Sequence, residues 1–420
     1  MTMPSYGRAR LVSLMSLFLL LLCTLVAVGG CRGKKRSHMT FAQYPGFKEF
    51  YGGQCGGDSK GELPTTAERA LLEKFRPRVI LPPGGNPLID FYRNYLPCTV
   101  MRSFEGGGEV EKRVTPSMLR ERKRRSDLYL DFQDKCFSER VEAGMVNPVA
   151  YGRLYRERVV FTDETGHLHS MNLIFLKYNF LFPVSGLPGR LPFGYERTLR
   201  LLGLEPDNWH ELDNFVAIHV VLDEGGTPRA IILAQHNYHR TYLVGRDLIL
   251  PTDGRMRFDV ALRSNEIYPS SASEKPVQHR VVQWAIHMKY LLSGKNPPFY
   301  HGYDITVGEN AGGVETGYEL LFLPSCDPLY TSEMMLGEPR PFFGRYIGRD
   351  GPPGSDYYTI PPLLPLGNIL KFSYLHDGDP GDIDMVEDAI DIDKRKIDIQ
   401  RIMDYGGQRL YRDILEEMRK

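Results

Sequence analysis

Residues 207–242, DNWHELDNFVAIHVVLDEGGTPRAIILAQHNYHRTY, decide the expected fold of this chain. Within them, residues 215–222 and 230–234 are apolar and rich in β-branched side chains, a composition that favours strands. The acidic and glycine residues at 223–226 are typical of a tight turn. The stretch therefore predicts two antiparallel strands joined as a β-hairpin.

Polar side chains crowd both outer ends of this hairpin. His210, Glu211 and Asp213 precede the first strand, and His236 and His239 follow the second. Pairing of the strands brings these ends side by side, and mixed nitrogen and oxygen ligands suit a divalent cation. We therefore take His210, Asp213 and His236 as candidate metal ligands, with Glu211 as a fourth. The alternative is that these groups cap strand ends and bond to loop backbone.

The rest of the chain also predicts mostly strands. Residues 159–162 and 171–183 (MNLIFLKYNFLFP) read as two strands joined by a short connection, and residues 257–263 alternate like a half-buried strand. The 42 glycines and 30 prolines among 420 residues favour turns over long helices. We expect a mainly β fold, an antiparallel β-sandwich with a few peripheral helices.

Four segments predict those helices, and residues 195–203 predict a brief helix or turn. Thr65 and Glu68 form a capping-box pattern that opens a helix ending at Lys74. Residues 117–133, which contain five basic side chains, and residues 274–293 are the next two expected helices. Residues 408–420 predict a short amphipathic helix. Its docking side chains would be Leu410, Ile414, Leu415 and Met418.

The N-terminus resembles that of a bacterial lipoprotein. Arg8 and Arg10 precede an apolar run, and Gly29 and Gly30 stand directly before Cys31, as in a lipobox. The resemblance implies cleavage before Cys31 and acylation of that residue, including palmitate. The alternative is an uncleaved anchor, because about 18 apolar residues span a bilayer. Small residues beside a cysteine favour the lipoprotein.

Several acyl chains on Cys31 would hold the protein stably to a membrane. In lipoproteins of this kind an aspartate after the cysteine often retains the protein at the inner membrane, and here that residue is Arg32. We therefore expect a lipid-anchored protein of the bacterial cell envelope, at the outer membrane.

Cysteine usage agrees with export. Of six cysteines, Cys23 leaves with the signal and Cys31 carries lipid. Four cysteines in an oxidising compartment suggest two disulfides with three connectivities, and four buried free thiols are the alternative. No C-x-x-C is present to support a zinc ribbon. The disulfide candidates are Cys55, Cys98, Cys136 and Cys326.

Composition and charge set the expected organisation. The signal peptide covers 1–30, a lipidated flexible linker 31–64, a β-sandwich domain with peripheral helices 65–345, and a Pro/Gly-rich and acidic tail with a C-terminal helix 346–420. Formal charge is +0, and removal of residues 1–30 loses two arginines and no acid, leaving 0 − 2 = −2. Nothing in that balance favours binding of nucleic acid.

The succession FRPRV, MNLIFLKYNFLFP, WHELDNFVAIHV, AIILAQHNYHRTY and RFDVALRSNEIYP resembles the vacuolar protein sorting-associated protein 62-like family. It resembles the necrosis-inducing protein family more distantly. The resemblance covers residues 75–269 and implies an antiparallel β-sandwich. In the necrosis-inducing relatives the motif binds a divalent cation at one end of the sandwich, which points to His210 and Asp213, with His236 nearby.

This chain departs from the family pattern at two places. Asn214 and Phe215 replace the family's Trp-Glu pair, so one carboxylate ligand is missing, and Ser264 and Asn265 stand where the family has serine and histidine. Glu211 is the residue that would substitute for the lost carboxylate.

Function is expected to lie among three classes. The first is an envelope lipoprotein that binds a partner protein or a glycan, or has a structural role, without catalysis and with no catalytic residue assigned. The second is a metal-dependent hydrolase of an envelope polymer or lipid, acting through the rim of His210, Asp213 and His236. The third is a membrane-active protein like the necrosis-inducing relatives, which permanent anchoring disfavours because such proteins must diffuse to their target. The sequence favours the first class.

Overall fold

The computed structural model describes residues 63–270 and 312–346 with short gaps, four short strands between 359 and 397, and residues 414–419. The expected signal peptide, the expected linker up to residue 62 and the expected helix at 274–293 lie outside these residues. The described part is mainly β, with mostly antiparallel sheets arranged like a sandwich and a few peripheral helices, as the sequence predicted. Among the described helices, none has the length and apolar character needed to span a bilayer.

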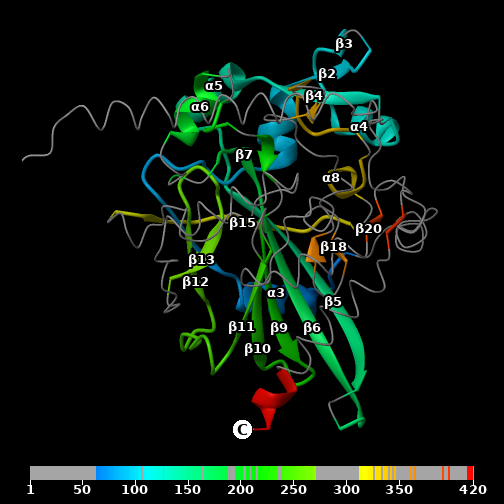
Figure 1. Cartoon of the computed structure of the whole chain (residues 1–420), viewed down its shortest axis with the longest axis vertical. Coiled ribbons are helices and arrows are strands. Elements are labelled where there is room, and N and C mark those ends of the chain that lie inside the picture. Colours follow the sequence, from blue (N-terminus) through cyan, green and yellow to red (C-terminus); the bar gives the residue numbers. More distant parts are fainter. Residues whose placement is uncertain are drawn as a thin grey trace, which may run out of the picture.

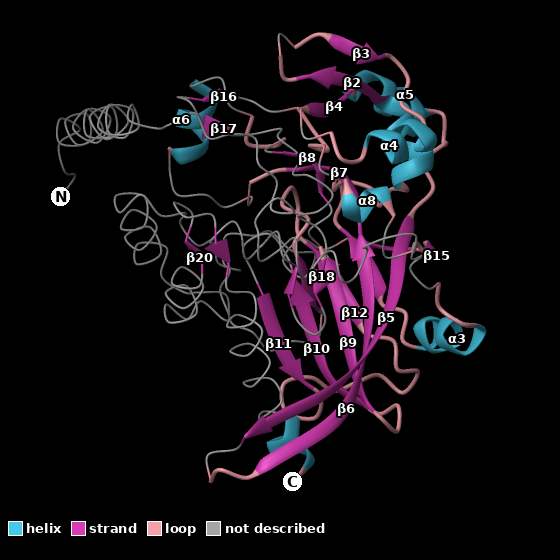
Figure 2. Ribbon diagram, turned by 90° about the vertical axis from the view of Figure 1, so that its right-hand side faces the viewer, coloured by secondary structure: helices cyan, strands magenta, loops and turns pink. Residues whose placement is uncertain are grey.

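A six-stranded sheet forms the centre, in the order β11-β10-β9-β6-β5-β15. Its strands are β5 (Val149–Thr162), β6 (Leu168–Phe180), β9 (Ala217–Asp223), β10 (Pro228–Ala234), β11 (His239–Leu243) and β15 (Glu319–Leu321). Figure 1 and Figure 2 show β5 and β6 as the longest pair, running together along the molecule. Within this sheet, β15 pairs parallel to β5, whereas the other described pairs are antiparallel.

The predicted hairpin is present as β9 and β10. Their antiparallel register runs from Pro228 opposite Leu222 to Ala234 opposite Ala217. The turn between them closes where the Gly226 amide donates to the Asp223 carbonyl at 2.9 Å. Alternating side chains of a strand point to opposite faces, yet every β9 residue except the last is buried, so both faces of the sheet are covered.

A second sheet covers one of these faces. It has the order β13-β12-β1-β14, with strands β1 (Arg78–Leu81), β12 (Arg257–Val260), β13 (Ile267–Pro269) and β14 (Val314–Thr316). Val79, Phe258 and Ile267 of this sheet pack against Tyr178 and Ile218 of the six-stranded sheet. We call this layer the sandwich core. Burial of such apolar side chains contributes about 1.5–3 kcal/mol each, which holds the two sheets together.

Helix α3 (Thr66–Lys74) closes the edge of the sandwich core through the buried Leu72. Its start follows the sequence prediction. The Thr65 side chain accepts from the Glu68 amide, and the Glu68 carboxylate accepts from the Thr65 amide at 2.9 Å, which completes a capping box.

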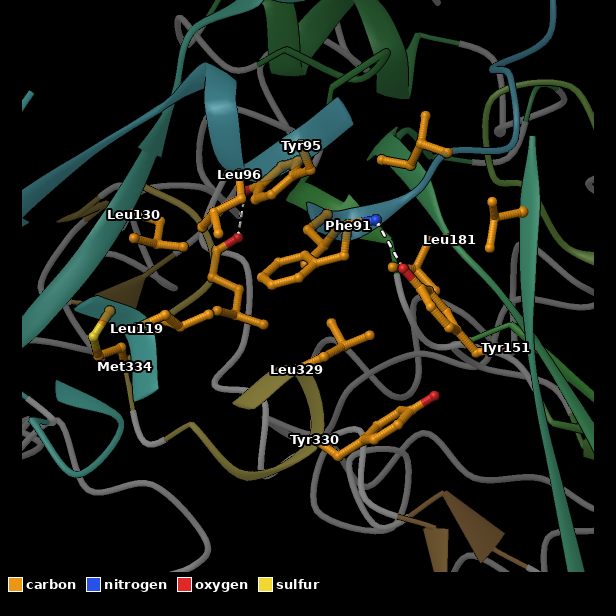
Figure 3. Close-up of a cluster of buried hydrophobic side chains, with 14 of the residues drawn as sticks. Phe91, Tyr95, Leu96, Leu119, Leu130, Tyr151, Leu181, Leu329, Tyr330 and Met334 are labelled. Atoms are coloured by element: carbon orange, nitrogen blue, oxygen red, sulfur yellow. Dashed lines mark hydrogen bonds between the residues drawn. The ribbon is translucent and has the colours of Figure 1, made fainter. Parts of the chain in front are cut away.

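A cap of short elements covers the other face, at the top of Figure 1. Its elements include the one-turn helices η2 (Phe91–Tyr95) and η3 (Leu96–Cys98), the three-stranded sheet of β2 (Thr99–Ser103), β3 (Glu109–Glu111) and β4 (Leu128–Phe132), and helices α4 (Pro116–Arg122), α5 (Asp134–Glu142) and α8 (Pro328–Thr331). Phe91, Tyr95, Leu130 and Leu329 are buried here in one cluster with Tyr151 of the large sheet, and Figure 3 shows the Phe91 amide donating to the Tyr151 hydroxyl. We call this layer the cap core.

The helix expected over 117–133 is wrong in its second half. Helix α4 ends at Arg122, and residues 128–132 form strand β4 instead. The segment LYLDF alternates, and its strand form is stabilised by pairing with β2, from Thr99 opposite Phe132 to Ser103 opposite Leu128. Tertiary pairing has overridden the helical pattern that the basic run suggested.

A disulfide joins Cys98, at the end of η3, to Cys136 in α5, with an S–S distance of 2.02 Å. The bridge closes a segment that contains all three strands of the cap sheet. The other two candidates, Cys55 and Cys326, lie outside the described residues.

The remaining described elements are short. They are β7 (Phe182–Ser185), β8 (His210–Asp213) and α6 (Tyr195–Leu201), and the two-residue strands β16 (Pro341–Phe342), β17 (Arg345–Tyr346), β18 (Thr359–Ile360), β19 (Leu364–Pro365), β20 (Ile390–Asp391) and β21 (Lys396–Ile397). The C-terminal helix is present at residues 414–418. This helix lies at the bottom of Figure 1, where Ile414 belongs to the buried cluster on this face of the large sheet and Leu415 packs against that cluster. Met418 is exposed, contrary to expectation, and Leu410 lies outside the described residues.

Candidate functional site

The predicted rim lies on strand β8, which pairs antiparallel with β7 and not with the hairpin. Leu212, in the middle of β8, is buried and has φ +41°, a backbone angle that is uncommon outside glycine. The strand is therefore irregular at Leu212. The two carboxylates on either side of it, Glu211 and Asp213, are fully buried but contact different parts of the molecule.

Glu211 faces the cap. Its Oε2 accepts from the Phe132 amide at 3.2 Å and from the Glu338 amide at 2.9 Å. Charge-assisted bonds of this kind compensate much of the cost of burying a carboxylate. Glu211 thus ties β8 to β4 and to the chain that follows α8.

Asp213 faces the loop that precedes β13. Its Oδ2 accepts from Asn265 Nδ2 at 2.8 Å, and the same nitrogen donates to the Val184 carbonyl at 2.9 Å. Asn86 Nδ2 donates to Asn265 Oδ1 at 3.0 Å, which fixes the amide orientation. Asn265 itself has φ +58° and is buried. The Asp213 carboxylate therefore fixes the path of this loop.

One group of three potential metal ligands forms among the described residues, and it contains Glu211 but not Asp213. Oxygens of Asp131, Glu211 and Glu338 all lie within 4.8 Å of one another. Carboxylate oxygens are the ligands that calcium and magnesium prefer. However, Asp131 also forms an ion pair with Arg102 at 2.6 Å, and Glu211 accepts two backbone bonds, so protein groups already account for much of their charge.

The remaining predicted ligands are not tested by the structure. The backbone of His210 belongs to β8, opposite Ser185, but its side chain and the whole of His236 lie outside the described residues. The metal site of His210, Asp213 and His236 therefore stays a prediction.

Sequence reasoning missed a row of basic side chains on the large sheet. The register places Arg153 of β5 opposite Lys177 of β6, and Lys177 opposite His219 of β9. All three share the face that the cap covers, because Tyr151, Phe175 and Val221 on that face lie two residues away from them. Their exposed fractions are 8%, 1% and 2%. Three adjacent basic residues in an interior are unusual, since charged side chains are seldom fully buried.

Tyr330 of α8 lies over this basic row. Its ring centroid is 5.5 Å from Arg153 Cζ and 5.5 Å from Lys177 Nζ, which gives a cation–π contact to each. Figure 3 shows Tyr330 near Tyr151, which lies two residues before Arg153 on the same face of β5. Helix α8 thus brings an aromatic face from the cap onto the charged part of the sheet.

Burial changes the proton affinity of the row. Burial, with the Arg153 charge second, lowers the pKa of Lys177 well below its usual range. Burial and then the Lys177 charge lower the pKa of His219 to about 3. Neither His219 ring nitrogen has a hydrogen-bond partner among the described residues. Perturbed basic groups that gather in one place are typical of functional sites.

A buried acid lies at the start of α8. Asp327 accepts from the Leu329 amide at 2.9 Å as the N-cap of the helix, and it also accepts from the Tyr92 hydroxyl. Burial raises the pKa of Asp327, and burial and the Asp327 charge raise the pKa of Tyr92. This pair fixes α8, and therefore Tyr330, against η2.

The sequence carried one signal of the row. Lys177 is the single charged residue within MNLIFLKYNFLFP, and His219 interrupts the apolar run VAIHVVL. A charged side chain inside a continuously buried strand costs stability unless another group compensates its charge.

No family model, no curated protein and no solved structure matches the chain. The resemblance drawn from residues 75–269 therefore stays an expectation from the sequence. Function has to follow from the side chains themselves.

Proposed function

We propose that the protein is a lipid-anchored lipoprotein of the bacterial cell envelope that acts as a binding module. The lipobox-like VGGC ending at Cys31 supports the anchor, and Arg32 supports the outer membrane as its address. The partner would be an envelope protein, a glycan or a smaller ligand.

The disulfide between Cys98 and Cys136 is the observation that carries the export part of the proposal. Disulfides persist in oxidising compartments such as the bacterial periplasm and are rare in the cytosol. Cys98 is buried in the cap core, so its bridge belongs to the folded interior rather than to an exposed redox centre.

The basic row supports binding over a purely structural role. Apolar residues at Arg153, Lys177 and His219 would pack the same sheet face without the cost of burying charge. Retention of three basic groups is understandable when a ligand needs them.

Replacement of Cys31 with serine tests the anchor. We expect the variant to accumulate as an unacylated precursor with a changed mass, whereas the wild type enters detergent-soluble membrane fractions. Cys23→Ser is the matched control, because that cysteine lies in the segment expected to be removed. An unchanged mature mass in Cys31→Ser would show that the chain is not a lipoprotein.

The second candidate is a metal-dependent hydrolase of an envelope polymer or lipid. The approach of Asp131 and Glu338 to Glu211 is the observation that favours it. Mass spectrometry of the full chain, purified without chelator or affinity histidines, should then find near-stoichiometric divalent metal. His210→Ala and Asp213→Ala should lose the metal if the predicted rim holds it, and Glu211→Gln alone should lose it if the carboxylate group does. Metal-free wild-type protein would remove this candidate.

A further inference from the structure

We propose that Arg153, Lys177 and His219 form a binding site for a small oxyanion, a phosphate or a carboxylate group, on the cap-facing side of the six-stranded sheet. This inference rests on the proposed function as a binding module and names its ligand class. Lys177 is the middle of the row, because it is paired with Arg153 on one side and with His219 on the other.

The spacing of the row fits such a ligand. Neighbouring strands lie about 4.8 Å apart, so three adjacent strands present their side chains within roughly 10 Å. An arginine fork and a lysine ammonium are the two cationic groups that proteins use most for phosphate and carboxylate. Both lie on the same face, at the same level of the sheet, under the Tyr330 ring.

The imidazole of His219 provides the second, independent observation. It is 2% exposed, and neither of its nitrogens has a hydrogen-bond partner among the described residues. Buried polar side chains nearly always have a partner, so the His219 ring lacks an acceptor that its N–H could use. An oxyanion held by Arg153 and Lys177 would supply that acceptor to a ring N–H.

A core without a ligand is the competing explanation. In it, Lys177 and His219 are both neutral, and Arg153 is the single charge of the row, stacked on Tyr330. The two explanations differ in their protons. Binding of an oxyanion would favour the protonated forms of Lys177 and His219, so the protein should take up protons as it binds. The groups that face Lys177 include Arg153 from β5, His219 from β9 and Tyr330 from α8.

Thermal unfolding of the full chain tests the site. Inorganic phosphate and citrate are added separately at constant ionic strength, with chloride as the balancing anion, so the two arms distinguish phosphate from carboxylate. We expect one of them to raise the unfolding midpoint, since a ligand that binds only the folded state stabilises it. Titration calorimetry in two buffers of different ionisation enthalpy should show proton uptake.

Lys177→Met removes the central cation while keeping a long apolar stem. We expect it to weaken anion binding by about tenfold or more, because a charge-assisted bond is lost. Lys135→Met is the matched control, since Lys135 lies on α5 and is 91% exposed, and it should bind like the wild type. If Lys177→Met fails to fold, His219→Leu takes its place with the same expected loss.

Two results would overturn the inference. One is a wild-type midpoint that neither anion raises above chloride. The other is an equal rise in the wild type and in the folded Lys177→Met or His219→Leu variant. Membrane fractionation of Cys31→Ser reports on the anchor alone. Loss of the anion effect with the anchor intact would therefore refute the site and not the lipoprotein.

Discussion

Removal of the bridge between Cys98 and Cys136 should destabilise the protein strongly. The two cysteines are separated by 38 residues along the chain, so the bridge restricts a sizeable loop in the unfolded state. For a loop of that length, the chain-entropy relation gives about 4 kcal/mol at 25 °C. The double variant Cys98→Ala/Cys136→Ala should lose about this much free energy of unfolding.

Urea unfolding followed by circular dichroism measures the loss. About 4 kcal/mol corresponds to a fall of about 1 M or more in the urea midpoint for slopes of ordinary size. The loss should extend to the whole body, because the closed segment carries Leu119 and Leu130, which pack in the cap core against the large sheet. One cooperative transition at lower urea is therefore expected.

The remaining candidate cysteines give the matched control. Cys55→Ala/Cys326→Ala removes the same number of cysteines without touching this bridge. A reductant should lower the urea midpoint of the wild type by breaking this bridge. The Cys98→Ala/Cys136→Ala variant has no such bridge to break, so the reductant should lower its midpoint less. The reasoning fails if that variant keeps the midpoint of the wild type, or if reductant has the same effect on both proteins.

Three further predictions follow from single residues. Gly186→Ala should lower the free energy of unfolding by about 1–3 kcal/mol, because its Cβ would lie 2.8 Å from one backbone carbonyl oxygen and 2.9 Å from another. Gly108→Ala is the control, since its Cβ meets nothing within 4 Å, and urea unfolding compares the two variants. Asn265→Ala should cost about 2–4 kcal/mol, since it removes the bond to Asp213 and places alanine at φ +58°; an unchanged urea midpoint would contradict this. In the folded protein the pKa of His219 is lowered from 6.5 to about 3. Between these two pH values the imidazole is protonated in the unfolded chain but neutral in the folded protein, so the stability present above pH 6.5 is lost as the pH falls. The melting temperature of His219→Leu should therefore fall less than that of the wild type between neutral and acid pH. An equal fall in the two proteins would refute this prediction.

The strands of the large sheet were predictable because local signals agree there. Residues 215–234 combine two apolar runs with a turn of acids and glycines, and the structure has β9 and β10 in those places. The same holds for β5 and β6, which pair from Ala150 opposite Phe180 to Thr162 opposite Leu168. Local propensity, pattern and turn chemistry all favour one structure in these segments.

The cap was harder to predict because its elements depend on distant partners. The basic run that ends at Arg125 suggested a helix, yet residues 128–132 obtain their hydrogen bonds from β2, about thirty residues earlier. The disulfide shows the same limit. Four cysteines leave the connectivity open, and the choice of Cys98 with Cys136 follows only when α5 packs against η3.

The candidate site was also predictable only in part. Glu211 and Asp213 were identifiable as a polar group before a strand, but their separation into two networks depends on the backbone angle at Leu212. The position of the basic row depends entirely on the strand register. Arg153 and Lys177 face each other only if β5 and β6 pair in this register, and a shift of one residue would send Lys177 to the sandwich core.

The register of β5 and β6 explains why the basic row is buried. The register is specified by the apolar residues on both faces, such as Phe175 on the cap side and Tyr178 on the sandwich side. The same apolar residues force Lys177 into the interior, where burial penalises its charge. An apolar residue at this position would avoid that cost, which is why we propose a ligand-binding role for the lysine.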